Sequence, residues 1–117
     1  MIKIRKYNSS IECIDGKTVT ITDRASIHIP GIRATMSDVR FILRKYHCKI
    51  YNSCDGVECS FIKTGIAKCS PQDTFSYETG KSIAGKRCWD KIRKTADRIV
   101  HDIVTRHLKR LKENIRY

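Results

Sequence analysis

Apolar and polar residues alternate in the first part of the chain, a pattern typical of β-strands. Residues 2–7 and 11–21 are expected to form short strands, and Asp15-Gly16 within the second stretch is a dipeptide that favours a hairpin turn. Pro30-Gly31 then interrupts the pattern. The sequence therefore predicts an N-terminal β-ribbon over residues 1–30.

Helical spacing of apolar residues follows this break. Ser37 is expected to cap a helix that ends at Tyr46, since serine accepts a hydrogen bond from an unpaired amide of a first helical turn. The inward positions of this helix are Val39, Ile42, Leu43 and Tyr46. Arg40, Arg44 and Lys45 should project away from that apolar stripe.

A period of two returns after His47 and predicts three short antiparallel strands, at residues 48–52, 57–63 and 66–69. The turn signals are Ser53 to Gly56 and a break near Thr64-Gly65. Ser70-Pro71 should then start a helical turn. Residues 31–76 are thus expected to form a helix and a three-stranded sheet.

The remaining residues, 77–117, predict one long amphipathic helix, from about Glu78 to Glu113. Its first apolar stripe, expected to pack on the sheet, is Cys88, Ile92, Ala96, Ile99 and Ile103. A second stripe is displaced around the helix and comprises Val100, Val104, Leu108, Leu111 and Ile115. The second stripe needs another partner, which is the N-terminal ribbon, a second copy of the chain, or the tail itself folded back at a bend near His101.

These elements predict one α+β domain spanning residues 1–117, with a β-ribbon, an α-β-β-β-α unit and a long C-terminal helix. No stretch approaches the length of apolar residues that spans a bilayer, and no signal peptide is recognised at the start. The six cysteines are therefore expected to be reduced, as in a cytoplasmic protein, here the cytoplasm of a host bacterium.

Charge narrows the choice of partner. The formal net charge is +12, and residues 81–117 hold 12 basic but only 4 acidic residues. Nucleic acid is the leading candidate for a partner and an acidic protein surface the second. The candidate binding residues are a basic helix edge, its first lysines and two arginines of the shorter helix: Lys81, Lys86, Arg87, Lys91, Lys94, Arg98, Lys109, Lys112, Arg40 and Arg44.

Other chemistry is less well supported by the sequence. Gly80-Lys81-Ser82 ends like a nucleotide-binding phosphate loop, but the glycine that such a loop needs is replaced by Phe75. The cysteine spacing matches no recognised zinc motif, although His47, Cys48, Cys54 and Cys59 are the candidate ligands. No histidine pairs with a nucleophile in the sequence, so we expect neither catalytic residues, metal nor cofactor.

Two resemblances add to this picture. The helix at 37–46, the strands over 48–69 and the last helix resemble the double-stranded-RNA-binding domain, which implies phosphate contacts near Lys81, Lys86 and Arg87. The stretches "GIAKCSPQDTF" and "GKSIAGKR" resemble a sequence found in small accessory proteins of bacteriophages and prophages. That second resemblance implies a mobile-element origin and a protein that acts on host machinery.

Together these observations predict a non-enzymatic basic protein that binds nucleic acid or a nucleic-acid–protein complex through the helix edge. Two alternatives remain open. The first is an anti-defence inhibitor, of the kind that binds CRISPR effectors, docking its basic edge on a host nuclease. The second is a dimer that sequesters a small anionic nucleotide.

Overall fold

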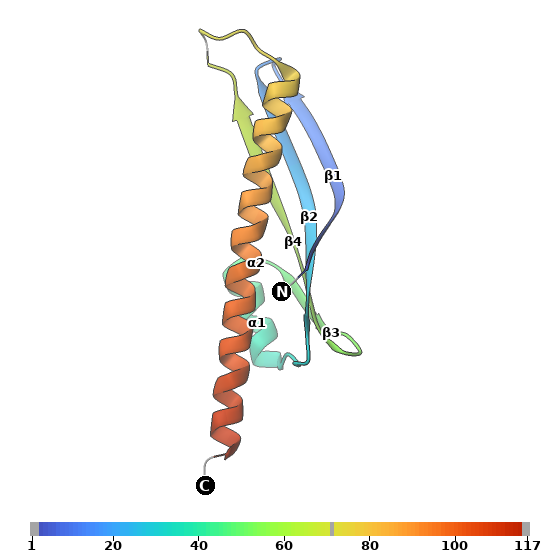
Figure 1. The fold of residues 1–117 in the computed structure, drawn as a ribbon, viewed down its shortest axis with the longest axis vertical. Coiled ribbons are helices and arrows are strands. Elements are labelled where there is room, and N and C mark those ends of the chain that lie inside the picture. Colours follow the sequence, from blue (N-terminus) through green and yellow to red (C-terminus); the bar gives the residue numbers. More distant parts are fainter. Residues whose placement is uncertain (1–2, 71, 116–117) are drawn as a thin grey trace. The chain divides into compact units, whose positions relative to one another are not determined.

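The computed structural model describes residues 3–70 and 72–115 and has a mixed α+β fold, as predicted. Its elements are β1 (Ile4–Ile14), β2 (Thr18–Pro30), α1 (Met36–Tyr46), β3 (Lys49–Asn52), β4 (Gly56–Lys68) and α2 (Tyr77–Ile115) (Figure 1). The four strands form one antiparallel sheet in the order β1-β2-β4-β3. No helix within the described residues is long and apolar enough to cross a membrane.

The chain divides into two compact units, which share the longer elements. The first unit comprises Ser26–Phe61 with the described parts of Met1–Arg5 and Thr95–Tyr117. It holds α1, β3 and the C-terminal half of α2. The second unit comprises Lys6–Ala25 and Ile62–Lys94, and it holds the N-terminal hairpin and the first half of α2.

In the second unit, the predicted hairpin turn is confirmed. Asp15 and Gly16 both have positive φ angles, 55° and 60°, which is the backbone that a tight turn between twisted strands requires. Strand β2 then continues far beyond the predicted end, and its alternate residues from Val19 onward are buried. The helix that covers them contributes Ala84, Cys88 and Ile92, all buried.

The predicted break at Thr64-Gly65 is wrong, because β4 runs without interruption from Gly56 to Lys68. Gly65 is a buried strand residue whose missing side chain lets α2 pack directly on the strand. A Cβ atom at this position would overlap the carbonyl oxygen of Ala84 and the backbone of Cys88. Two strands, β3 and β4, therefore follow α1 in place of the three predicted.

In the first unit, α1 packs against β3 and lies beside the later turns of α2 (Figure 1). Its N-cap is Thr35 and not Ser37, since the Thr35 side chain accepts a bond from the Asp38 amide. Ile42 is the fully buried apolar residue of α1, whereas Leu43 is 52% exposed, contrary to the predicted inward position. The helix turns its N-terminal carboxylate, Asp38, toward the interior instead.

The long helix is confirmed with nearly the predicted ends, Tyr77 and Ile115. The backbone amide of Asp73 bonds the Ser70 carbonyl in a turn, but the helix starts only after Ser76, whose hydroxyl accepts a bond from the Thr79 amide. Pro71 lies outside the described residues. All five residues of the first predicted stripe of α2, from Cys88 to Ile103, are buried as expected.

We expect Gly65→Ala to destabilise the protein by about 2 kcal/mol, because the added methyl group must push the helix backbone off the strand. Urea unfolding measures this change. The matched control is Gly85→Ala, where a Cβ would lie 3.6 Å from Ile21 Cδ1 in ordinary contact. That control should gain up to about 1 kcal/mol from helix propensity. A Gly65→Ala protein as stable as the parent would contradict the close packing described.

Candidate functional site

A buried carboxylate joins the two helices of the first unit. Asp38, in the first turn of α1, is fully buried. Its Oδ1 accepts from Arg106 Nε at 2.7 Å and its Oδ2 pairs with Arg110 Nη1 at 2.9 Å. Oδ2 also accepts from the Thr35 amide at 2.9 Å. A buried charge is stable only when it is paired and hydrogen-bonded, so this cluster fixes the start of α1 against α2.

Arg106 also contacts two other residues of α1. Its Nη2 donates to Ser37 Oγ at 2.7 Å, and its guanidinium lies 4.7 Å from the centre of the Phe41 ring. Lys45 Nζ lies 5.4 Å from the same ring and donates to Asp102 Oδ2 at 2.9 Å. The aromatic ring thus holds two cations beside it, and both cations are anchored to carboxylates.

These side chains line a shallow groove of about 560 Å³ within the first unit. Its lining residues come from α1 and from one position of α2: Ser37, Arg40, Phe41, Arg44, Lys45 and Arg106. Arg40 and Arg44 are exposed, and neither side chain has an ion pair or hydrogen bond with any of the residues described. We call this feature the α1 groove. Its excess positive charge comes from the two uncommitted arginines, since Lys45 is paired with Asp102 and Arg106 with Asp38.

The two carboxylates that anchor cations of the α1 groove have lowered pKa values. Burial raises the pKa of Asp38, but the Thr35 amide, Arg106 and Arg110 outweigh it, so the net shift is below the ordinary value. Asp102 behaves alike, because bonds from Tyr46 and Lys45 lower its pKa more than burial raises it. The bond to Asp102 also raises the pKa of Lys45. Both carboxylates therefore stay ionised, and Lys45 stays charged, at pH 7.

The predicted basic edge of α2 has a different role in the second unit. Arg87 Nη1 donates to the Ile66 carbonyl at 2.7 Å, and Lys91 Nζ donates to the Thr64 carbonyl at 2.8 Å. These two side chains therefore bond the backbone of β4. The other predicted contacts of this unit are exposed to solvent: Lys81, Lys86 and Lys94.

In the first unit, Arg98, Lys109 and Lys112 of the same edge are exposed. Arg40 and Arg44 were predicted to bind the partner, and they do lie together in the α1 groove. Sequence reasoning missed Arg106, because its position continues the buried face of the helix. The available signal was its spacing of four from Arg110, which places two arginines where one buried acid can meet both.

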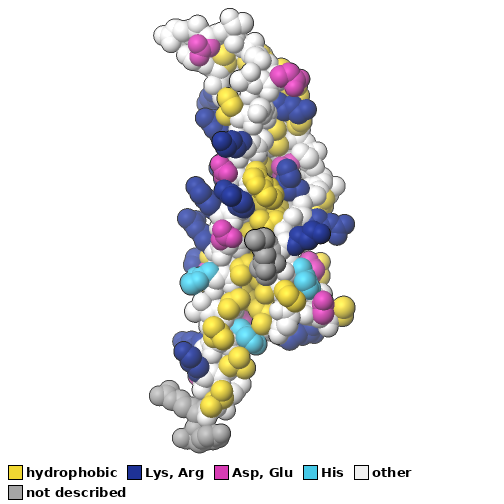
Figure 2. Space-filling view, in the orientation of Figure 1, with side chains coloured by type: hydrophobic (Ala, Val, Ile, Leu, Met, Phe, Trp, Pro, Cys, Tyr) yellow, Lys and Arg dark blue, Asp and Glu magenta, His cyan; other side chains and the backbone are white. Residues whose placement is uncertain are grey.

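The second apolar stripe of α2 is only partly covered. Val100 and Val104 are half-buried, but Leu108 is 51% and Ile115 is 68% exposed, with Leu111 between them also exposed. Figure 2 shows hydrophobic side chains gathered over the last turns of this helix. The stripe thus lacks a full cover among residues 3–70 and 72–115. A second copy of the chain as that cover stays a prediction.

The cysteines and histidines do not form a metal site in the described part of the chain, where no group of three or more possible ligands comes together. Of the four candidate ligands, Cys48 and Cys59 are buried while His47 and Cys54 are exposed. A hydrogen bond with Cys48, followed by burial, raises the pKa of Cys59, so the pair is a poor source of thiolate. His28 Nδ1 lies 2.8 Å from Glu58 Oε1, and His28 Nε2 lies 3.2 Å from Asp55 Oδ1.

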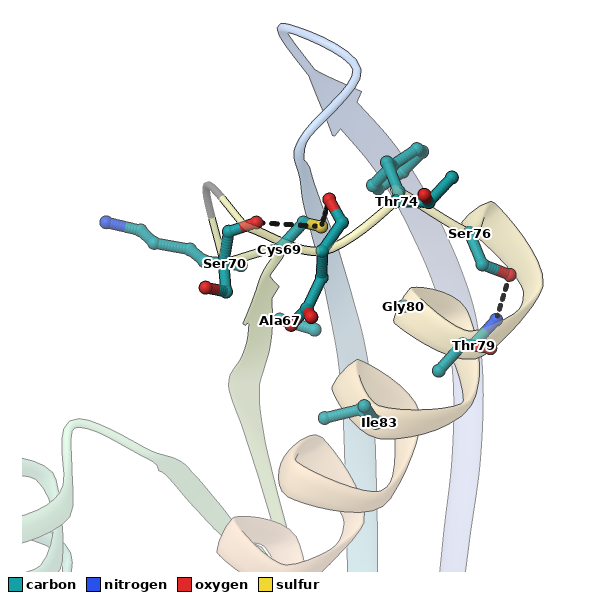
Figure 3. Close-up of a pocket in the computed structure, with 11 residues that line it drawn as sticks. Ala67, Cys69, Ser70, Thr74, Ser76, Thr79, Gly80 and Ile83 are labelled. Atoms are coloured by element: carbon teal, nitrogen blue, oxygen red, sulfur yellow. Dashed lines mark hydrogen bonds between the residues drawn. The ribbon is translucent and has the colours of Figure 1, made fainter.

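Gly80, from the tripeptide that resembled a phosphate loop, lines a separate pocket of about 310 Å³ in the second unit (Figure 3). Gly80 lies within helix α2, where a Cβ atom would lie 2.8 Å from Val19 Cγ2 of β2. Its missing side chain therefore allows the helix to pack closely against the strand. Lys81 is not among the lining residues, which include Cys69, Ser76, Thr79 and Ile83. The pocket therefore lacks the lysine that a phosphate loop uses.

One further polar cluster of the second unit escaped the sequence reasoning. Asp23 faces the interior from β2 and is only 3% exposed. Its Oδ2 accepts from the Cys88 thiol at 3.6 Å and lies 3.8 Å from Lys6 Nζ, which is itself 5.4 Å from the Trp89 ring. Burial and the nearby carboxylate raise the pKa of Cys88. The thiol is thus protonated at neutral pH and is a weak nucleophile.

Asp38→Asn should destabilise the protein by about 3 kcal/mol, because two guanidinium groups would face a neutral amide in place of a carboxylate. Chemical denaturation measures this loss. The control is Asp97→Asn on the exposed side of α2, which should change stability by less than about 0.5 kcal/mol. Equal stability of the two variants would contradict an anchoring role for Asp38.

The pH dependence of the Asp38 contribution has a definite sign. Its folded-state pKa lies below the ordinary value of 3.8, so the contribution is present above that value and is lost as the pH falls through the lower, folded-state pKa. The parent should therefore lose stability below about pH 4 more steeply than Asp38→Asn. Unfolding midpoints measured down to low pH test this difference, and parallel curves would refute it.

Comparison with protein-family models, with curated proteins and with solved structures finds no match for this chain. No family can therefore lend its residues or its activity to the site. Within the first unit, the α1 groove brings the exposed Arg40 and Arg44 together beside Lys45 and Arg106.

Proposed function

We propose that this protein binds nucleic acid without cleaving it, through phosphate contacts in the α1 groove. The observation that carries the proposal is the pair Arg40 and Arg44, which line a groove with Lys45 and Arg106 and have no acidic partner among the described residues. An arginine side chain donates to two phosphate oxygens at once, so two free arginines one helical turn apart suit neighbouring phosphates.

A polyanion fits this site better than a small anionic ligand. The groove is shallow and open, and the same unit exposes further cations on α2 at Arg98, Lys109 and Lys112. The chain as a whole carries a net charge of +12. A nucleic acid offers repeated phosphates to such a surface and gains affinity by releasing its counterions.

The proposed phosphate contacts do not distinguish one base from another. Phe41 is half-buried and has Arg106 and Lys45 beside its ring, so it offers no free platform on which a base could stack. Arginines that meet phosphates position a nucleic acid but carry no sequence information. The protein should therefore bind unrelated sequences with similar affinity.

The double change Arg40→Glu with Arg44→Glu should weaken binding to a short DNA duplex by more than about tenfold at about 50 mM salt. Each lost phosphate contact lowers the slope of log affinity against log salt by about 0.9, so the slope should fall by about 2. Fluorescence anisotropy of a labelled duplex at several salt concentrations measures both quantities.

The control keeps the net charge of that variant but leaves the groove intact. Lys3 and Arg5 are exposed cations of the first unit, and Lys3→Glu with Arg5→Glu changes the charge by the same amount. This control should lose far less affinity and keep most of the salt slope. If both double variants weaken binding equally, only net charge matters and the groove is not the site. No binding of the parent to DNA or RNA at about 50 mM salt would end the proposal.

A further inference from the structure

Strand β4 leaves one of its edges open in the second unit. Strand β3 has four residues and pairs with β4 only from Val57 to Ser60. Strand β2 lies on the other side of β4. From Ile62 to Lys68, no strand of the described chain lies on the β3 side. An open edge of this length is a ready site for pairing with another extended segment.

The direction of the backbone groups along this edge follows from two side chains. Arg87 donates to the Ile66 carbonyl and Lys91 to the Thr64 carbonyl, so both carbonyls face away from β2. In an antiparallel strand a residue's N–H and C=O point to the same side, so the amides of Thr64 and Ile66 also face the open edge. Arg87 and Lys91 cover the carbonyls but, as cations, leave the N–H donors unmatched.

Charge selects the kind of segment that fits this edge. The strand contributes Lys63 and Lys68 and the helix contributes Arg87 and Lys91, so four cations flank it. A second copy of this edge would bring the same four charges against them, which is unfavourable. On the solvent face, Ile62 and Ile66 are 51% and 43% exposed, which favours apolar neighbours there.

We propose that the open edge of β4 binds an extended acidic segment of a partner protein as an additional strand. Acidic side chains of that segment would meet Arg87 and Lys91 on the helix face, and apolar side chains would lie beside Ile62 and Ile66 on the other face. Its sequence would thus alternate acidic and β-branched residues. The Thr64 and Ile66 amides, one strand period apart, match the carbonyl oxygens of another strand.

The test uses a fluorescein-labelled peptide of alternating Glu and Val and the full chain. The peptide should bind, and amide hydrogen exchange at Thr64 and Ile66 should slow by about tenfold or more on binding. The same peptide with N-methyl groups on its pairing amides should bind at least about tenfold more weakly, because it cannot complete the ladder. Neither measurement requires a variant of the protein.

A second test reverses the charges of the two helix cations beside this edge. Arg87→Glu with Lys91→Glu should weaken peptide binding by about tenfold or more. The matched control, Lys81→Glu with Lys86→Glu, makes the same charge change at exposed positions of the same helix and should have a small effect. Equal affinity for the N-methylated peptide, unchanged exchange at Thr64 and Ile66, or equal effects of the two double variants would each overturn the proposal. The test is independent of the α1 groove, whose variants lie in the first unit.

Discussion

The arrangement of the first unit depends on one buried negative charge. Asp38 is fully enclosed and would be costly to bury unless cations met both of its oxygens. Arg106 and Arg110 supply those cations from successive turns of α2, while the Thr35 amide completes the cluster. These contacts therefore fix the position of the start of α1 along α2. That constraint fixes Arg106, which lines the α1 groove, against Asp38 and Ser37 at the start of α1.

Some of the basic residues that carry the net charge bond to other parts of the fold, and others do not. Arg106 and Arg110 neutralise a buried acid, while Arg87 and Lys91 cover the carbonyls of an open strand edge. Arg40 and Arg44 have no such partner in the part of the chain that the structure describes. Net charge alone thus indicates a class of partner, and only the contacts indicate where that partner would bind.

Local signals in the sequence predicted the hairpin turn at Asp15-Gly16, the long helix and its buried stripe, because turn chemistry and helical spacing depend on neighbouring residues. Long-range packing decided the rest. Gly65 looked like a turn residue, but the helix needs its missing side chain. Ser37 looked like a cap, but Thr35 caps and Ser37 binds Arg106. Helical spacing predicted the basic edge of α2. The bonds from this edge to β4 could not be predicted, because they join residues far apart in the sequence.

In the proposed complex, Arg40 and Arg44 bind phosphates while Arg106 stays bound to Asp38. Arginine side-chain Nε–H signals in NMR spectra report this directly during titration with a short DNA duplex. The signals of Arg40 and Arg44 should move with increasing DNA, while the signal of Arg106 should keep its position. Shifts confined to lysines and arginines outside the α1 groove, with Arg40 and Arg44 unchanged, would rule out phosphate binding in this groove.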